Sequence, residues 1–248
     1  MDDVLLHHAL FLFATFAASL VASISGFAFG LLAAAVWLHI LPPAQTATLI
    51  IAFGLLVQGV AVWKLRHALD GSRLWPFLLG AAFGVPLGVA LLGWADVAQI
   101  QVGVGIVLVL YSVYGLARPT FAPVRIGGAP LDSGIGFLNG VLGGVTGFAG
   151  IVVTIWSGLR GWPKDVQRTV FQPVGVATFA MTALWLGAKG AVAGDTVKLF
   201  LMGLPVLLGG TWLGLRLYGR LDEATFRRIV LLLLLLSGCL LLIPPIRQ

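Results

Sequence analysis

Apolar runs of roughly twenty residues recur along the whole of this 248-residue chain, and a helix of that length crosses a hydrocarbon core about 30 Å thick. Only 10% of the residues are charged, against about a quarter in soluble domains. The sequence therefore predicts an all-α integral membrane protein. Ten apolar segments can be distinguished, at residues 4–22, 26–41, 44–63, 74–93, 97–116, 133–146, 147–159, 169–188, 198–215 and 224–243.

Several function classes are excluded by what the chain lacks. It contains no H-E-x-x-H, G-x-S-x-G or G-x-x-x-x-G-K-[ST] motif, and its four histidines do not pair with acidic residues at metal-ligand spacing. We therefore expect neither an enzyme nor a bound cofactor, and any transport would run on a gradient or on a separate subunit. The basic residues fall between the apolar runs rather than in a stripe with aromatics, so we expect no nucleic-acid partner despite the net charge of +6.

A linker divides the chain into two halves of five segments each. The stretch "ARPTFAPVRIGGAPLD", residues 117–132, contains three prolines and two glycines, so residues 1–116 and 133–248 form separate transmembrane repeats. "GVPLGVALLGWAD" at 84–96 aligns without gaps on "GTWLGLRLYGRLD" at 210–222, and "SGFA" at Ser25 matches "TGFA" at Thr146. Because each repeat has an odd number of segments, the second copy is expected to be inverted relative to the first.

The distribution of basic residues tests this topology independently. With the N-terminus outside, the inward connections hold twelve of the fifteen Lys and Arg residues: Lys64, Arg66, Arg73, Arg118, Arg125, Arg160, Lys164, Arg168, Arg216, Arg220, Arg227 and Arg228. Positive charge is enriched on the cytoplasmic side of membrane proteins. We therefore expect a multi-pass protein of a bacterial inner membrane, with both termini outside.

Two of the segments are too short to cross a bilayer comfortably. As helices, residues 133–146 and 147–159 reach only about 20 Å each. They resemble half-helices that enter from one face and meet at "VTGFAG", because irregular backbone at membrane depth is tolerated only when it is buried in protein or lines a cavity. The counterpart pair meets at "SISGFAFG" and is longer, so eight full spans with re-entrant pairs and ten full spans remain alternatives.

The two breaks indicate a site for an anion. A half-helix that begins at Gly147 would direct unsatisfied N–H groups and partial positive charge into the membrane interior. Gly26 stands at the corresponding place in the first half, whereas Gly80, Gly84, Gly88, Gly210 and Gly214 have the spacing of helix-packing glycines. The candidate residues at the breaks are Ser25, Gly26, Phe27, Thr146, Gly147 and Phe148.

Polar side chains within the spans add three further candidates. Asn139 lies about one helical turn before the glycine break that starts at Gly143, and Gln172 follows Arg168 by four residues, which places both on one face of a helix. Asn139 and Gln172 suit either substrate binding or interhelical hydrogen bonding, and Gln58 favours packing. Arg168 suits either a topology signal or an anion ligand, and no Asp or Glu lies near the middle of any segment.

Several stretches resemble one family of permeases. They are "SGFAFG", "GGVTGFAGIVVTIW", "RGWPKDVQRTVFQP" and "KLRHALDGSRLWPFLLGAAFGVPLG", and with the five-plus-five layout they are similar to the TauE/SafE (sulfite exporter, TSUP) family over nearly the whole chain. The resemblance implies secondary transport of small sulfur-containing or carboxylate anions, such as sulfite, sulfoacetate or other organosulfonates. Phe29 stands where family members usually have a glycine, which implies a more aromatic site in the first half.

Three hypotheses follow. The first is an anion transporter that works by alternating access, with the candidate residues at the breaks, Asn139, Gln172 and Arg168 as its substrate site. The second is a passive anion channel, and the third is a non-transporting membrane protein, either an assembly factor or an enzyme that uses a partner's catalytic group. The expected partners are a small anion and the lipid bilayer, with a homodimer as an open alternative.

Overall fold

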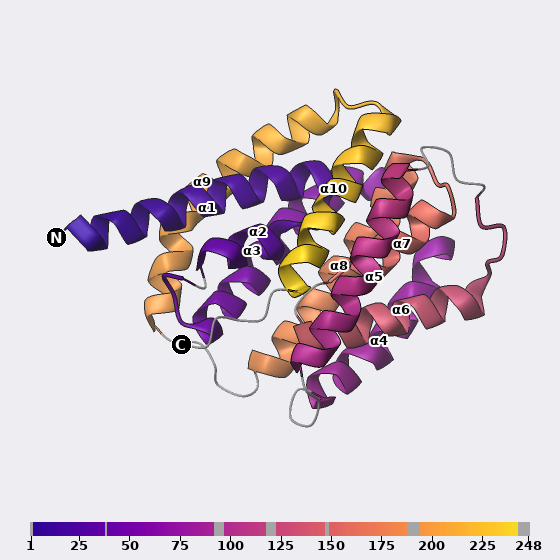
Figure 1. Cartoon of the computed structure of the whole chain (residues 1–248), viewed down its shortest axis with the longest axis horizontal. Coiled ribbons are helices and arrows are strands. Elements are labelled where there is room, and N and C mark those ends of the chain that lie inside the picture. The colour runs from indigo at the N-terminus through magenta and orange to yellow at the C-terminus, as the bar shows by residue number, and fades with distance from the viewer. Residues whose placement is uncertain are drawn as a thin grey trace.

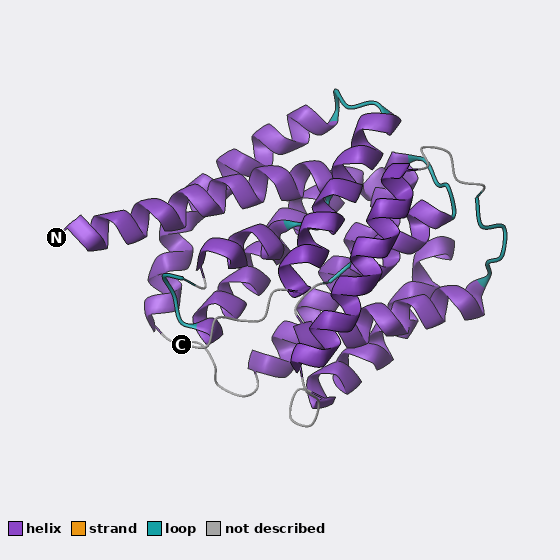
Figure 2. Ribbon diagram, viewed as in Figure 1, coloured by secondary structure: helices purple, strands orange, loops and turns teal. Residues whose placement is uncertain are grey.

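The regular structure of the chain is helical. A computed structural model describes residues 2–37, 39–91, 97–117, 123–146, 149–187 and 194–242, and over these ranges it contains helices and loops but no strand (Figure 2). Each predicted apolar segment contains one α-helix, which confirms the all-α class. The elements are α1 (Asp2–Ser25), α2 (Phe29–Trp37), α3 (Pro43–Leu65), the 3₁₀ turn η1 (Arg66–Ala68), α4 (Gly71–Leu91), α5 (Val97–Ala117), α6 (Ala129–Thr146), α7 (Ile151–Leu159), α8 (Lys164–Gly187), α9 (Gly194–Tyr218) and α10 (Glu223–Leu242).

Four stretches of helix within the described residues are long and apolar enough to cross a membrane, namely Leu5–Ser25, Gln45–Ala68, Gly71–Leu91 and Asp195–Tyr218. The helices α2 and α7 have nine residues each, which corresponds to about 13 Å and is less than half of a hydrocarbon core. Both breaks therefore separate a longer helix from a half-helix.

The helix α6 is longer than the sequence predicted. Its start was expected at Ser133, but it begins at Ala129 and has 18 residues, or about 27 Å. The last four residues of the predicted linker therefore belong to the helix. Pro130 stands in the first turn, where the missing N–H costs no hydrogen bond, and the backbone N–H of Asp132 donates to Gly128 at 3.0 Å.

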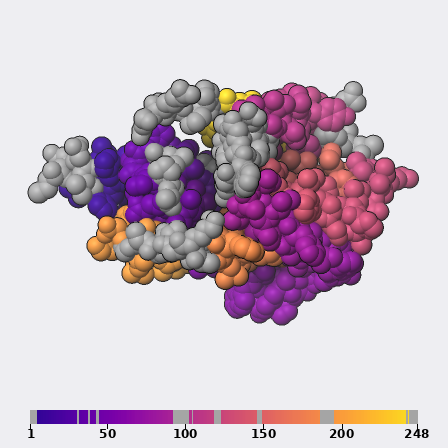
Figure 3. Space-filling view, turned by 90° about the horizontal axis from the view of Figure 1, so that it is seen from below, coloured from indigo at the N-terminus to yellow at the C-terminus, as the bar shows by residue number. Residues whose placement is uncertain are grey.

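The helices pack in long pairs around a central helix. Figures 1 and 3 show α1 with α9 at one side of the molecule and α4 with α6 at the other. The helices α5 and α10 form a third pair, and α8 contacts α3, α4 and α7 (Figure 1). Both breaks meet α8, because Gly26 lies against Phe171 and the helices α6 and α7 contact α8.

Glycines let these pairs approach each other closely. A Cβ on Gly84 of α4 would overlap the backbone oxygen of Phe137 in α6, and one on Gly88 would overlap that of Val141. This confirms the interpretation of these glycines as packing residues, because any larger side chain would push the two backbones apart.

The pair of α1 and α9 is built in the same way. A Cβ on Gly210 of α9 would lie 2.7 Å from the backbone oxygen of Phe16, and one on Gly214 would overlap that of Leu20 in α1. The packing interpretation of Gly210 and Gly214 is therefore also confirmed.

The half-helix α2 is fixed by aromatic side chains. The fully buried Trp37 stacks on Phe11 of α1 with ring centroids 5.1 Å apart, and Phe29 meets the ring of Phe53 in α3 edge-on at 6.0 Å. Phe29 is 1% exposed and belongs to this aromatic core. It therefore anchors α2. The family resemblance had implied instead that Phe29 makes the site at the first break more aromatic, and the structure does not place it there.

The basic connections between helices meet at one end of the molecule. The guanidinium of Arg73 lies 5.8 Å from the ring centroid of Trp162, and Arg160 pairs with Asp132 at 3.9 Å. At the same end, the backbone N–H of Lys164 donates to Glu223 at 2.9 Å. The four connections that the charge pattern assigned to one side thus contact one another.

Candidate functional site

The first break follows the end of α1. Gly26 has a φ of 93°, in the left-handed region that favours glycine. The hydroxyl of Ser25 donates to the backbone oxygen of Val21 at 3.0 Å, and the ring of Phe27 meets Phe171 edge-on at 6.4 Å. Both Ser25 and Phe27 are buried, so within the described structure they shape the break from inside α1 and from the core.

Gly26 lies directly against α8. A Cβ at this position would overlap the ring of Phe171 and would lie 3.1 Å from Nε2 of Gln172. Only a residue without a side chain therefore lets the break and α8 come this close. Gly150, at the second break, lies near the backbone of the same residue, because its Cβ would lie 3.6 Å from the backbone oxygen of Phe171.

The second break is described only in part. Gly150 begins the half-helix α7 with a φ of 94°. The candidates Gly147 and Phe148 lie outside the described residues, and Thr146 is described only as the last residue of α6. Their roles therefore stay predictions.

Asn139 stabilises the second break. Its side chain is fully buried, its Oδ1 accepts a hydrogen bond from the backbone N–H of Gly150 at 3.0 Å, and its Nδ2 donates to the hydroxyl of Thr178 at 3.3 Å. One amide thus joins α6, α7 and α8. Of the two roles that the sequence allowed, the structure shows interhelical hydrogen bonding.

Arg168 is a buried cation near the end of α1. Its exposed fraction is 0%, its Nη2 donates to the backbone oxygen of Ser23 at 2.9 Å, and its Cζ lies 3.8 Å from the ring centroid of Tyr218. Within the described part of the chain, its Nε and Nη1 have no hydrogen-bond partner and no ion pair includes it. The hydroxyl of Tyr218 donates in turn to Asp165 at 2.5 Å.

Gln172 extends this polar group by one helical turn of α8. It is 1% exposed, and its Oε1 has no partner among the described residues. The hydroxyl of Ser23, on the facing helix, is also buried and unpartnered there. The structure thus brings Arg168, Gln172 and Gly26 together at the first break, while Asn139 lies at the second.

These groups have the chemistry of an anion site. A buried charge is costly unless it is paired, and the planar guanidinium donates to oxyanions in a bidentate manner. Because two nitrogens of Arg168 face no acceptor in the described structure, a small oxyanion would complete their hydrogen bonding and neutralise the charge.

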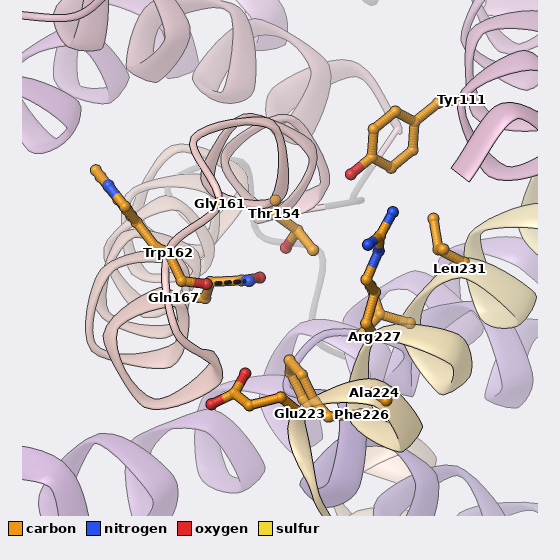
Figure 4. Close-up of a pocket in the computed structure, with 12 residues that line it drawn as sticks. Tyr111, Thr154, Gly161, Trp162, Gln167, Glu223, Ala224, Phe226, Arg227 and Leu231 are labelled. Carbon is orange, nitrogen blue, oxygen red and sulfur yellow. Dashed lines mark hydrogen bonds between the residues drawn. The ribbon is translucent and has the colours of Figure 1, made fainter. Parts of the chain in front are cut away.

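A cavity of about 330 Å³ is lined by Trp162 and Glu223 at the basic end of the molecule and by Thr154 of α7 (Figure 4). Its walls come from α5, α7, α8 and α10, and Thr154 in its lining donates to the backbone oxygen of Gly150 at 2.8 Å. Phe226 also lines it, and its ring packs edge-on against Tyr218, which covers Arg168. Two aromatic rings therefore stand between this cavity and the buried guanidinium.

Sequence reasoning missed Ser23, Tyr218 and the cavity. The partner atoms of Arg168 lie 145 residues upstream in Ser23 and 50 residues downstream in Tyr218, and neither residue stands out in a run of apolar sequence. The alignment of the repeats offered no signal for Tyr218 either, because it falls opposite the apolar Leu92.

Comparison with known proteins identifies the family. The model of one family, described as sulfite exporter TauE/SafE, matches residues 11–241. Neither the search of curated proteins nor the search of solved structures found a match. Because the family match extends over nearly the whole chain, this multi-pass transmembrane permease belongs to the sulfite exporter TauE/SafE family.

Proposed function

We propose that the protein is a secondary transporter of small sulfur-containing anions, such as sulfite, sulfoacetate or other sulfonates. In this proposal the anion binds between the first break and α8, where Arg168 and Gln172 meet Gly26. The observation that carries the proposal is the fully buried guanidinium of Arg168, whose Nε and Nη1 have no partner in the described part of the chain.

Sulfite and sulfonates fit these donors. Each offers several oxygens around one sulfur, so two of them can accept from the Nε and Nη1 hydrogens of Arg168 side by side. The amide of Gln172 lies one turn further along α8, and its oxygen and nitrogen ends can exchange places by a rotation, so it can donate to a third oxygen. Ser25 at the end of α1 and Phe27 in the first break close the site, and Thr146, Gly147 and Phe148 are expected to supply donors from the second break.

Alternating access is supported by equivalent contacts in the two halves. The register that aligns Ser25 with Thr146 also aligns Phe16 with Phe137, and Gly84 aligns with Gly210. Gly84 packs on the backbone of Phe137 and Gly210 packs on that of Phe16. The same contact is therefore made twice, with the halves exchanged, as in transporters built from inverted repeats.

The contact between α3 and α8 supports the same symmetry. A Cβ on Gly54 of α3 would lie 3.1 Å from the ring of Phe179 in α8, and one on Gly175 of α8 would overlap the amide of Gln58 in α3. The register of Ser25 and Thr146 relates Gly54 to Gly175 and Gln58 to Phe179. A self-complementary contact of this kind is expected beside a two-fold axis. We infer that the two inverted repeats rock about this axis.

The orientation follows from charge. The basic connections meet at one end of the molecule, and we assign that end to the cytoplasm of a bacterial cell, with both termini outside. The half-helices α2 and α7 then re-enter from opposite faces, and the breaks that precede them meet α8 near Phe171.

Reconstitution tests this function. Purified protein in liposomes is loaded with unlabelled sulfite, and uptake of labelled sulfite, sulfoacetate, thiosulfate and short carboxylates is followed. We expect uptake of the labelled anions that saturates with concentration and is driven by exchange against the unlabelled sulfur anions inside. Flux that follows the gradient without saturation would instead favour the passive channel, and folded protein that moves none of these anions would favour a non-transporting role.

A further inference from the structure

The cavity at the basic end carries charged and polar side chains of its own. Figure 4 shows Arg227 and Tyr111 on one side of it, facing Thr154 and Gln167 across the space. Valine, leucine, phenylalanine and tryptophan side chains complete the lining. With a volume of about 330 Å³, the cavity can hold a small organic oxyanion together with water.

Arg227 is fixed in the wall of this cavity. Its Nη2 donates to the backbone oxygen of Gly115 in the last turns of α5 at 3.4 Å. The first turn of α10 is held by Asp222, whose Oδ1 accepts from the backbone N–H of Thr225 at 3.3 Å. Hydrogen bonds from Thr225 keep the pKa of Asp222 below its usual range.

Tyr111 supplies a second donor one turn earlier on α5. A Cβ on Gly158 of α7 would lie only 2.6 Å from its hydroxyl oxygen, so the glycine lets the hydroxyl reach across to α7. Figure 4 shows this hydroxyl and the guanidinium of Arg227 directed into the same part of the cavity. A tyrosine hydroxyl beside a guanidinium provides converging hydrogen-bond donors for an oxyanion.

One acidic residue opposes this charge. Glu223 also lines the cavity, and it precedes Arg227 by one turn of α10. Its Oε2 accepts from the backbone N–H of Lys164 at 2.9 Å, on the α8 side of the opening. Figure 4 shows its carboxylate directed away from the guanidinium. The two ends of the cavity therefore differ in charge, with the acidic group nearer the connection that precedes α10.

We propose that Arg227 and Tyr111 form a second binding site for the transported oxyanion, separate from the buried site at Arg168. A sulfite or sulfonate group is held there by the guanidinium and the phenolic hydroxyl before it passes the ring pair of Tyr218 and Phe226. This inference rests on the proposed function, because it assigns the same cargo to a second place along the path. The site serves only the face of the membrane to which this cavity opens.

Transport from each face tests the inference. Inside-out and right-side-out membrane vesicles that contain the protein present labelled sulfite to opposite faces, and KM is measured in both. Arg227→Gln should raise KM about tenfold at one face and leave it unchanged at the other, because one charge-assisted hydrogen bond is lost. Glu223→Gln should lower KM about threefold at that same face, because a like charge is removed.

Arg228→Gln is the matched control. Arg228 is the next residue of α10, carries the same charge and is exposed, and it does not line the cavity. Its KM should equal that of the native protein at both faces. If Arg227→Gln does not fold, Tyr111→Phe takes its place, with a rise of about threefold expected at one face.

The results separate the two proposals. Suppose that the native protein transports sulfite, and that Arg227→Gln, or its substitute Tyr111→Phe, leaves KM unchanged at both faces. This result would overturn the second site and leave the proposed function intact. An equal rise at both faces would also overturn the second site, because the residue would then act on the shared site. A native protein that transports no sulfur anion would overturn the proposed function itself.

Discussion

The guanidinium of Arg168 on α8 donates a 2.9 Å hydrogen bond to the backbone oxygen of Ser23 in the last turn of α1. The last four carbonyl groups of a helix lack partners within it, and the negative end of the helix dipole favours a cation there. The break after Ser25 thus creates an acceptor in the interior, and Arg168 occupies it with one nitrogen. The two remaining nitrogens stay unpartnered within the described structure.

Gln172→Glu should block transport by imitating the substrate. The side chain keeps its size, and a carboxylate four residues after Arg168 on the same helix face can pair with its guanidinium. We expect counterflow of sulfite to fall at least about tenfold, while the temperature of unfolding without substrate stays equal or rises.

Gln58→Glu is the comparison for that substitution. Gln58 is also a buried amide, but it lies on α3 against Gly175, away from Arg168. A new carboxylate there has no cation to pair with and should lower stability without any gain from pairing. Full transport activity in folded Gln172→Glu would contradict the assignment of the site.

Gly26→Ala should destabilise the protein more than Gly150→Ala. Both positions have φ near 90°, which costs a residue with a side chain about 1–3 kcal/mol. At Gly26 the new Cβ would also overlap Phe171, whereas at Gly150 the nearest atom is 3.6 Å away. Thermal unfolding in detergent measures which of the two variants is less stable.

The control for these two variants is Gly59→Ala in α3, where the added Cβ meets nothing within 4 Å. Alanine is the better helix former by about 0.5–1 kcal/mol, so this variant should equal or exceed the native stability. An equal loss at Gly26, Gly150 and Gly59 would refute the account of the breaks.

Asn139→Ala should lower stability but leave affinity nearly unchanged. It removes the acceptor for the buried N–H of Gly150, at a cost of about 1–3 kcal/mol. Thr178→Val, which removes only the 3.3 Å contact to Nδ2, should cost less. Sulfite binding per folded molecule is measured by titration calorimetry. If the Asn139→Ala variant binds sulfite tenfold more weakly without losing stability, Asn139 is a substrate-binding residue.

The equivalence that we propose for the repeats predicts a matched pair of variants. Gly84→Ala and Gly210→Ala each force a Cβ toward the backbone of the partner helix, at Phe137 and Phe16, and should each cost about 1–3 kcal/mol. Gly209→Ala, next to one of them, has open space within 4 Å and should be neutral. Thermal unfolding measures the stability of the three variants. A loss of stability in only one of Gly84→Ala and Gly210→Ala would contradict the equivalence of the two helix pairs.

Local sequence was sufficient for the helices and for the place of the first break. Residues that lie in apolar runs form helices whatever their partners, and Gly26 marks the break because only glycine adopts its φ without strain. At the second break α6 ends at Thr146, as predicted, and the half-helix α7 begins at Ile151, four residues after its predicted start at Gly147.

Contacts between residues far apart in the chain could not be predicted from local sequence patterns. The spacing of Arg168 and Gln172 placed them on one face of a helix, but nothing in the sequence indicated that this face meets Ser23 or that Tyr218 covers the guanidinium. The five glycines of the two long helix pairs were correctly assigned to packing, because their spacing of four residues is a property of one helix alone. Their partners became known only from the fold.

Arg168→Gln tests the central claim most directly. Glutamine can still donate to Ser23 but lacks the charge and the bidentate donors, so sulfite binding should weaken at least about thirtyfold and counterflow should be nearly lost. Arg216→Gln is the matched control, because Arg216 also lies over an aromatic ring, 4.0 Å from the centroid of Trp212, but is exposed. It should transport normally. A folded Arg168→Gln variant that binds and exchanges sulfite as the native protein does would contradict the account.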